Sequence, residues 1–298
     1  MTPRPSSPKR PAKPGRTAGA PAKAAGGKAG KAAQESVKRT AKATARPGGG
    51  AKAARAPRAR KEGLDEAVIA KLLPYLRALR GYTRLKADGL ENVPRGPAIL
   101  AANHTGWLGL DYALTALVLH DEAKRTPRGM VHSAWFGNPV TARFARQVGL
   151  SRVSKESMAQ DLADGHLVMV FPEGEKGAFR IASDYEVLEF ARGFVRVAMA
   201  TQLPVVPVAV LGGEESNPVD RTIKGYEEML KLQLPVPRNI LPKPVKWRIR
   251  FLPPIAFTDY TAADADDADR VHAIAEDVRT RIQRELRRLQ KERGHPYI

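Results

Sequence analysis

Short apolar runs that alternate with segments of helical periodicity are the feature that most constrains the fold of this 298-residue chain. The apolar runs have the length and composition of β-strands, and they lie near residues 84–88, 97–102, 129–133, 167–171, 205–211 and 246–252. The helical segments lie near residues 110–120, 139–147, 155–164, 188–201 and 267–292. Strands that alternate with helices predict an α/β fold, with a mixed, largely parallel sheet flanked by helices on both faces.

The positive charge of the chain is concentrated at its N-terminal end. The formal net charge is +19, but residues 1–62 carry 17 Lys and Arg against two Glu, which gives +15. The remaining residues carry 33 basic and 29 acidic side chains, or +4. The first segment consists mainly of Ala, Pro, Lys, Gly and Arg, and such a composition buries too little apolar surface to offset the entropy of folding. We therefore expect a disordered basic tail over residues 1–62.

Three interpretations of this tail are open at the level of sequence. An anionic membrane surface attracts a polybasic segment by about 1 kcal/mol for each Lys or Arg near it. Nucleic acid attracts the same segment through the release of counterions. A solubilising extension would need no specific partner. The tail lacks the apolar centre of a signal peptide, so we do not expect it to direct secretion.

Residues 63–298 have the composition of a globular domain and are numerous enough for one sizeable core. The segment 63–82 predicts an amphipathic helix, kinked or divided at Pro74, that lies in a membrane interface or packs on its own domain. The segment 267–293 predicts a C-terminal surface helix with one buried stripe. No run reaches 18 apolar residues, so we expect no transmembrane helix and a cytoplasmic protein peripheral on the inner face of the membrane.

An imidazole and a carboxylate lie close together at a predicted strand-to-helix turn. The apolar run 97–102 ends at Asn103 and His104, and Asp111 falls in the first turn of the next helix, where the helix dipole favours an ionised acid. Asp111 can fix the tautomer of His104 through one ring nitrogen and leave the other nitrogen to take a proton from an alcohol. We therefore predict that His104 is a general base and that Asp111 orients it.

A second polar motif follows a second buried strand. The continuous apolar run 167–171 suits a strand covered on both faces, and Pro172-Glu173-Gly174 forms its exit. In a largely parallel sheet, functional loops gather at the carboxyl ends of the strands. Both His104 and Glu173 are expected at such ends.

These motifs, followed by the strand Val205-Val206-Pro207-Val208, resemble those of the glycerolipid acyltransferases of the lysophosphatidic acid acyltransferase type. The resemblance runs from about residue 86 to residue 255. Six residues separate His104 from Asp111 here, whereas the family commonly has four.

Two further departures from the family pattern concern basic residues. The family's basic motif between the two blocks is matched weakly, by Gly149-Leu150-Ser151-Arg152. In the second block, Lys176 stands where relatives usually carry Arg.

The resemblance implies a transfer of a fatty acyl chain from acyl-CoA or acyl carrier protein to the hydroxyl of a lysophospholipid such as 1-acylglycerol-3-phosphate. His104 would deprotonate that hydroxyl and Asp111 would stabilise the imidazolium. The residues expected to bind or order the substrate are Asn103, Arg152, Glu173, Gly174, Lys176 and Arg180. The three cations in this set are the candidates for a phosphate group of the acceptor.

Other chemistries have little support in the sequence. The chain contains no cysteine, which excludes a cysteine acyl-enzyme and favours direct transfer. Clusters with metal-ligand spacing, phosphate loops and dinucleotide-binding motifs are also lacking, so we expect no metal and no cofactor beyond the thioester donor. Two alternatives are an inactive acyltransferase-like domain tethered by its tail, and an acyl thioesterase, in which the same base would activate water.

Overall fold

A computed structural model describes residues 63–181, 185–223 and 234–298 of the chain. The predicted disordered tail of residues 1–62 lies outside these described residues. The main sheet has the strand order β1-β9-β6-β2-β5-β3-β4. Its strands are β1 (Lys86–Asp88), β2 (Ala98–Ala102), β3 (Arg128–Val131), β4 (Leu150–Arg152), β5 (Leu167–Val170), β6 (Val205–Leu211) and β9 (Arg248–Phe251). A smaller antiparallel pair is formed by β7 (Val219–Ile223) and β8 (Leu234–Pro237).

The predicted sheet type is confirmed. Strands β6, β2, β5, β3 and β4 run parallel to one another. Strand β9 pairs antiparallel with β6 and parallel with β1, so the two strands at this edge run against the other five. The sheet is therefore mixed and largely parallel, as the alternation of strands and helices predicts.

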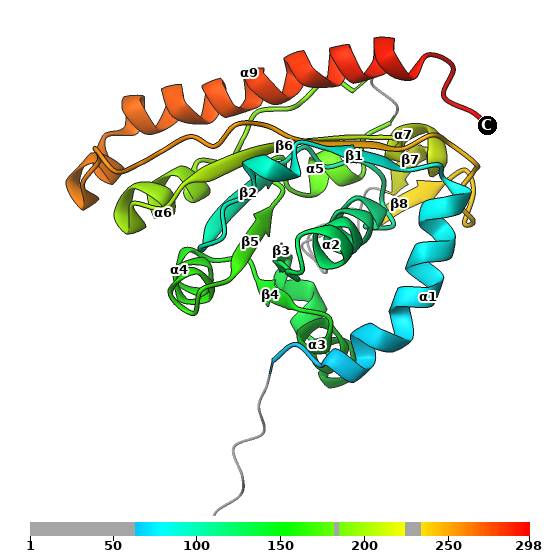
Figure 1. The fold of residues 1–298 in the computed structure, drawn as a ribbon, viewed down its shortest axis with the longest axis horizontal. Coiled ribbons are helices and arrows are strands. Elements are labelled where there is room, and N and C mark those ends of the chain that lie inside the picture. The colour runs from blue at the N-terminus through cyan, green and yellow to red at the C-terminus, as the bar shows by residue number, and fades with distance from the viewer. Residues whose placement is uncertain (1–62, 182–184, 224–233) are drawn as a thin grey trace, which may run out of the picture. The chain divides into compact units, whose positions relative to one another are not determined.

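The helices cover both faces of the sheet (Figure 1). Their bounds are α1 (Glu66–Tyr82), α2 (Leu110–Glu122), α3 (Pro139–Gln147), α4 (Lys155–Ala163), α5 (Glu175–Ala178), α6 (Gly193–Thr201), α7 (Gly213–Ser216) and α9 (Ala268–Arg293). Short 3₁₀ helices cover Leu90–Asn92, Ser133–Phe136 and Ala262–Asp266. Side chains of α2 pack on one face of the sheet, and α1 lies against α2. Side chains of α4, α6 and α9 pack on the opposite face.

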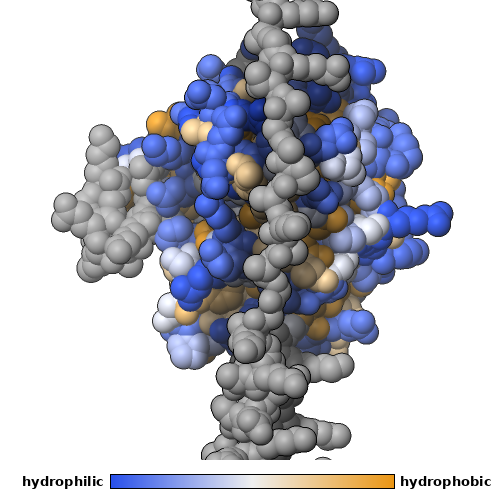
Figure 2. Space-filling view, turned by 90° about the vertical axis from the view of Figure 1, so that its left-hand side faces the viewer, coloured by the Kyte–Doolittle hydropathy of each residue, from blue (hydrophilic) through white to orange (hydrophobic). Residues whose placement is uncertain are grey.

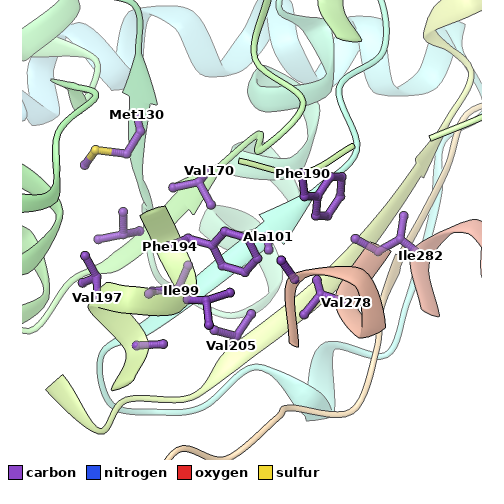
Figure 3. Close-up of a cluster of buried hydrophobic side chains, with 14 of the residues drawn as sticks. Ile99, Ala101, Met130, Val170, Phe190, Phe194, Val197, Val205, Val278 and Ile282 are labelled. Carbon is purple, nitrogen blue, oxygen red and sulfur yellow. The ribbon is translucent and has the colours of Figure 1, made fainter. Parts of the chain in front are cut away.

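The core follows the alternation of side chains along the central strands. In β2, Ile99 and Ala101 join the cluster under α6 and α9, whereas Ala98, Leu100 and Ala102 join the cluster under α2. Figure 3 shows the first cluster, with Phe190 and Phe194 between the strands and Val278 and Ile282 of α9. All five side chains of β2 are fully buried, so the strand that leads to His104 is held at the centre of the protein.

The two predicted terminal helices form. Helix α1 runs through Pro74 without being divided. It packs on its own domain, where Arg77 and Arg80 form ion pairs with Asp121 and Glu122 of α2. Helix α9 begins at an N-cap aspartate, Asp267, which accepts hydrogen bonds from two backbone N–H groups of the first turn.

Other elements differ from the sequence prediction in extent. The helix predicted from residue 188 begins only at Gly193, because the preceding N–H groups are used elsewhere: Leu188 donates to Glu173 and Ala191 donates to the carbonyl of Pro172. The short strands β4, β7 and β8 and the one-turn helices α5 and α7 were not predicted.

Within the described residues, no helix is both long enough and apolar enough to cross a membrane. Figure 2 shows one face of the molecule, on which hydrophilic residues predominate and hydrophobic residues form separate small patches.

Candidate active site

The candidate site lies where adjacent central strands end. Strands β6, β2 and β5 are neighbours and run parallel, so their carboxyl ends meet at one edge of the sheet. His104 follows β2 by two residues and Glu173 follows β5 by three. The structure therefore brings the two predicted motifs together at this edge.

His104 and Asp111 form a direct hydrogen-bonded pair. Nδ1 of His104 lies 2.5 Å from Oδ2 of Asp111. The Asp111 side chain is fully buried and the His104 side chain is 19% exposed. Because an ionised carboxylate only accepts hydrogen bonds, this contact places the ring proton on Nδ1. Nε2 then carries the lone pair, and it forms no hydrogen bond with any described residue.

Backbone groups fix the carboxylate of Asp111 in this position. Its Oδ2 also accepts from the N–H of Thr105 at 2.9 Å, and its Oδ1 accepts from the N–H of Tyr112 at 2.8 Å. The six residues between His104 and Asp111 therefore form a turn that closes on the carboxylate. Gly106 and Gly109 adopt φ values of +85° and +69° within this turn, a conformation that favours glycine.

Asn103 and Phe171 also fix the position of His104, the first through the main chain and the second through the imidazole ring. The Asn103 amide donates to the carbonyl of Val210 at 2.9 Å and accepts from its N–H at 2.8 Å, so it continues the hydrogen-bonded ladder between β2 and β6 by one step. The ring of Phe171 stacks on the imidazole, with 4.2 Å between the ring centres and 21° between the planes. Together these contacts define both the position of the main chain and the plane of the ring.

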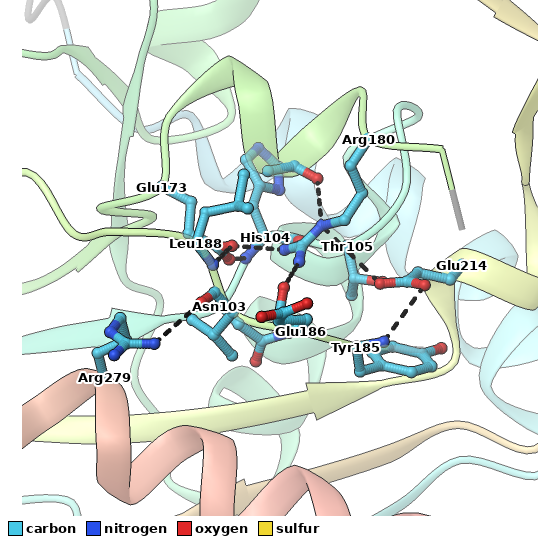
Figure 4. Close-up of polar contacts among 12 residues, drawn as sticks. Asn103, His104, Thr105, Glu173, Arg180, Tyr185, Glu186, Leu188, Glu214 and Arg279 are labelled. Atoms are coloured by element: carbon cyan, nitrogen blue, oxygen red, sulfur yellow. Dashed lines mark hydrogen bonds and ion pairs between the residues drawn. The ribbon is translucent and has the colours of Figure 1, made fainter. Parts of the chain in front are cut away.

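Glu173 and Arg180 form a second pair, which encloses the main chain of His104 (Figure 4). Oε1 of Glu173 accepts from the N–H of His104 at 2.7 Å, and Nη2 of Arg180 donates to its carbonyl at 2.8 Å. The pair is closed by a 2.6 Å ion pair between Arg180 Nη2 and Glu173 Oε2. The backbone N–H of His104 is therefore bonded to one buried acid, and its backbone carbonyl is bonded to one buried base.

The remaining hydrogen-bonding capacity of this second pair is also used. Glu173 Oε2 accepts from the N–H of Leu188 at 2.8 Å. The guanidinium of Arg180 donates through Nε to the carbonyl of Gly177 at 3.0 Å and through Nη1 to the carbonyl of Glu186. Burial raises the pKa of Glu173 above its ordinary value, and the charge of Arg180 together with the two N–H donors partly offsets this rise.

Two glycines allow these segments to approach one another. A Cβ on Gly177 would lie 2.7 Å from the Cβ of Glu173 and 3.1 Å from the Cβ of His104. A Cβ on Gly213 would lie 2.3 Å from the carbonyl oxygen of Thr105. Helices α5 and α7 can therefore pack against the His104 loop only with glycine at these positions.

The other predicted substrate-binding residues lie in different surroundings. Gly174 adopts a φ of +63° and precedes α5, in which Lys176 is exposed. Arg152 ends β4, is exposed, and lies over the ring of Phe136 at 5.5 Å from its centre. In contrast, Asn103 and Arg180 have their polar side-chain atoms in contact with the protein itself.

Several residues of the site were not identified from the sequence. Phe171 lies next to the Pro-Glu-Gly motif and was assigned only to a strand. Leu188 and Gly177 act through a backbone N–H and through the lack of a side chain, neither of which a sequence motif reveals. Within the described residues, no group of three or more His, Asp or Glu side chains is arranged to hold a metal ion.

Comparison with known proteins identifies the family of the region that carries the site. The acyltransferase family model matches residues 84–211, a range that includes both His104 and Glu173. Residues 84–211 form an acyltransferase-family domain. The resemblance stated from the sequence motifs is thereby confirmed at the level of this family.

The curated relatives of this chain are uncharacterised proteins. The chain is 34% identical over 239 residues to an uncharacterised protein of Mycobacterium tuberculosis, with 76% of this chain and 66% of that protein aligned. It is 36% identical over 231 residues to an uncharacterised protein of Mycobacterium leprae, with 72% and 63% aligned. The chain thus spans slightly less than two thirds of the length of the curated relatives it matches.

A solved structure shares the fold. The crystal structure of the 1-acyl-sn-glycerophosphate acyltransferase PlsC from Thermotoga maritima matches with a TM-score of 0.51 and 18% sequence identity, covering 76% of this chain and 80% of that one. The similarity shows a common fold.

Proposed function

We propose that this acyltransferase-family protein transfers a fatty acyl chain from a soluble thioester donor, acyl-CoA or acyl carrier protein, to the hydroxyl of a lysophospholipid such as 1-acylglycerol-3-phosphate. The observation that carries this proposal is the 2.5 Å contact between His104 Nδ1 and the buried Asp111, which leaves Nε2 as an available base. The family match over residues 84–211 supports acyl transfer as the reaction. The fold is shared with PlsC, a 1-acyl-sn-glycerophosphate acyltransferase, and this supports a lysophospholipid as the acceptor.

In the proposed reaction, Nε2 of His104 takes the proton of the acceptor hydroxyl while the hydroxyl oxygen attacks the thioester carbonyl. The C–O ester bond forms and the C–S bond breaks, and the departing thiolate takes from the imidazolium the proton that the acceptor hydroxyl lost. Asp111 holds the ring in the required tautomer and stabilises its positive charge between the two proton transfers. No covalent acyl-enzyme is required.

An apolar cavity beside α2, the helix that carries Asp111, supports a lipid substrate. The cavity has a volume of about 260 Å³, lies between α1, α2, α3 and β4, and has almost entirely apolar walls. Tyr112, the residue after Asp111, forms part of its wall, and burial raises the pKa of its hydroxyl, which therefore stays neutral. We assign this cavity to a hydrocarbon chain of a substrate.

Lys176 and Arg152 are our candidates for direct contact with an acceptor phosphate, because both are exposed. Arg180 contributes its positive charge from beneath the His104 loop, since its donors are already engaged. Asn103 and Glu173 hold the loop on which the base lies, and Gly174 forms the turn that leads from Glu173 into α5.

The experiment that tests the proposal measures thiol release from a long-chain acyl-CoA, with and without lysophosphatidic acid in detergent micelles. We expect acceptor-dependent release by the wild type, and a loss of about 10³-fold or more in His104→Ala with an unchanged unfolding midpoint. The exposed His295 provides a matched control, and His295→Ala should retain wild-type turnover. Release without acceptor would indicate a thioesterase, and full activity of His104→Ala would refute the assigned base.

We also propose that the protein associates with anionic membrane surfaces, with residues 1–62 as the electrostatic contact. Deletion of residues 1–62 should reduce binding to phosphatidylglycerol vesicles at low salt and leave turnover on micellar substrate unchanged. Vesicle binding that is independent of this segment would contradict the assignment.

A further inference from the structure

Residues 185–188, here called the connecting segment, lie between helix α9 and the candidate active site. The side chains of Tyr185 and Val187 are buried in the hydrophobic cluster that α9 covers. The backbone polar groups of the segment alternate in direction, as they do along a β-strand. Those of residues 185 and 187 bond to side chains of α9, and those of residues 186 and 188 bond to the Glu173–Arg180 pair. The segment therefore has one edge on the C-terminal helix and the other on the site.

The side-chain amide of Gln283 holds the edge that faces α9. Its Oε1 accepts from the N–H of Val187 at 2.7 Å, and its Nε2 donates to the carbonyl of Tyr185 at 3.0 Å. The amide thus bonds the segment as the peptide group of a neighbouring strand would. Arg279, one turn earlier on α9, adds a bond to the carbonyl of Val187 at 3.2 Å (Figure 4). Because the adjacent Ile282 is fully buried in the core, Gln283 holds the segment from a fixed position.

The opposite edge of the connecting segment bonds to the pair that encloses the base. The carbonyl of Glu186 accepts from Nη1 of Arg180, and the N–H of Leu188 donates to Oε2 of Glu173 at 2.8 Å. The same two side chains bind the carbonyl and the N–H of His104, at 2.8 Å and 2.7 Å. Each step from α9 to the main chain of the base is therefore a direct hydrogen bond. A displacement of the segment would move the pair and, through it, the base.

We propose, on the basis of the proposed acyl transfer, that Gln283 is a positioning residue for His104, which it acts on through the connecting segment and the Glu173–Arg180 pair. General-base catalysis requires the base to lie within hydrogen-bond reach of the proton that it takes, and a misplacement of about 1 Å can cost about 10²-fold in rate. Gln283 lies in α9, outside the residues 84–211 that the family model matches. The C-terminal helix thus contributes to the site as well as covering the sheet.

The kinetic test uses Gln283→Met, because Met keeps the length of the side chain and removes both hydrogen bonds. At a temperature where the variant is fully folded, we expect kcat for acyl transfer to fall about tenfold or more, with KM for donor and acceptor within about twofold of the wild type. Gln147→Met is the matched control, since it removes a partly buried amide that joins α3 to Asp65. It should retain the wild-type kcat. An unchanged kcat in Gln283→Met, an equal fall in both variants, or a loss in KM alone would overturn the proposal.

Amide hydrogen exchange needs no turnover and separates this proposal from the proposed function. The N–H of His104 is bonded to Glu173, and the N–H of Leu100, in the fully buried strand β2, reports on global unfolding. In Gln283→Met, exchange at His104 should accelerate more than exchange at Leu100, whereas Gln147→Met should leave the ratio of the two rates unchanged. An unchanged ratio in Gln283→Met would overturn the positioning role. If the wild type transfers no acyl chain, the proposed function fails, and this ratio alone decides whether Gln283 holds the main chain of His104.

Discussion

Two pairs of an acid and a base meet at the same edge of the sheet, and they differ in how completely their polar atoms are used. In the His104–Asp111 pair, one ring nitrogen is bound to the carboxylate and the other is available to a substrate. In the Arg180–Glu173 pair, both carboxylate oxygens and all three guanidinium nitrogens contact the protein. The comparison indicates that the first pair performs chemistry and that the second fixes the main chain that carries it.

The largest effect is expected from Asp111→Asn, which breaks the first pair. An amide nitrogen next to Nδ1 reverses the tautomer of His104 and places a proton on Nε2, so the base is no longer available. We expect kcat for acyl-CoA to fall by about 10²-fold to 10⁴-fold. The control Asp277→Asn removes an acid from an exposed pair with Arg281 and should leave kcat unchanged. A wild-type kcat in Asp111→Asn would show that Asp111 is not needed to orient the base.

Arg180→Ala breaks the second pair and should act mainly on stability. Removal of the guanidinium leaves the buried carboxylate of Glu173 without its counter-charge, a change that costs about 3–5 kcal/mol in the free energy of unfolding. Urea denaturation measures this loss. Arg192→Ala, which breaks an exposed pair with Glu189, should change stability by well under 1 kcal/mol. Similar losses in the two variants would mean that the buried pair does not support the fold.

Gly177→Ala tests whether the two pairs depend on close packing. The added methyl group would press on Glu173 and His104, and we expect a loss of about 1–3 kcal/mol in the free energy of unfolding together with reduced turnover. Gly193→Ala adds a methyl group at a helical glycine with open space around it, and it should be neutral or slightly stabilising. If the two variants have the same unfolding temperature and the same turnover, neither stability nor activity depends on the close approach at Gly177.

The smallest effect concerns the pH dependence of the second pair. Because burial raises the pKa of Glu173 in the folded state, the folded protein binds this proton more tightly than the unfolded chain does. The contribution of Glu173 to stability is therefore complete below the unfolded pKa of about 4.5 and declines as the pH rises through the folded pKa. Urea denaturation of wild type and Glu173→Gln at pH 4.5 and pH 7 should show the difference shifting in favour of the variant at the higher pH. A shift in the opposite direction would mean that the Arg180 charge outweighs burial.

The order of strands and helices, and the meeting of the two motifs, could be predicted from the sequence because both follow from local patterns. The apolar runs of β2, β5 and β6 are continuous, and parallel strands bring their carboxyl ends together. The proximity of His104 and Asp111 could be predicted because both lie in one strand-to-helix turn. The short strand β4 has only three residues and a polar composition, which gives no periodic signal.

The contacts of Arg180 could not be predicted, because they join segments that are distant in the sequence. Its donors reach the carbonyl of His104, 76 residues earlier, and a sequence motif does not distinguish a cation that faces a substrate from one that faces the main chain. The same holds for Asn103, whose amide bonds to Val210 at a separation of 107 residues.

The Asn103 amide takes the place of a peptide group in the ladder between β2 and β6, and this affects how such a protein can diversify. Its contact with Val210 ties the position of His104 to the central sheet as well as to the loops around it. Segments farther out, such as α1 and α3 at the apolar cavity, can then change in length and composition without displacing the base. Substrate preference in this fold can therefore change over evolution while the chemistry stays in one place.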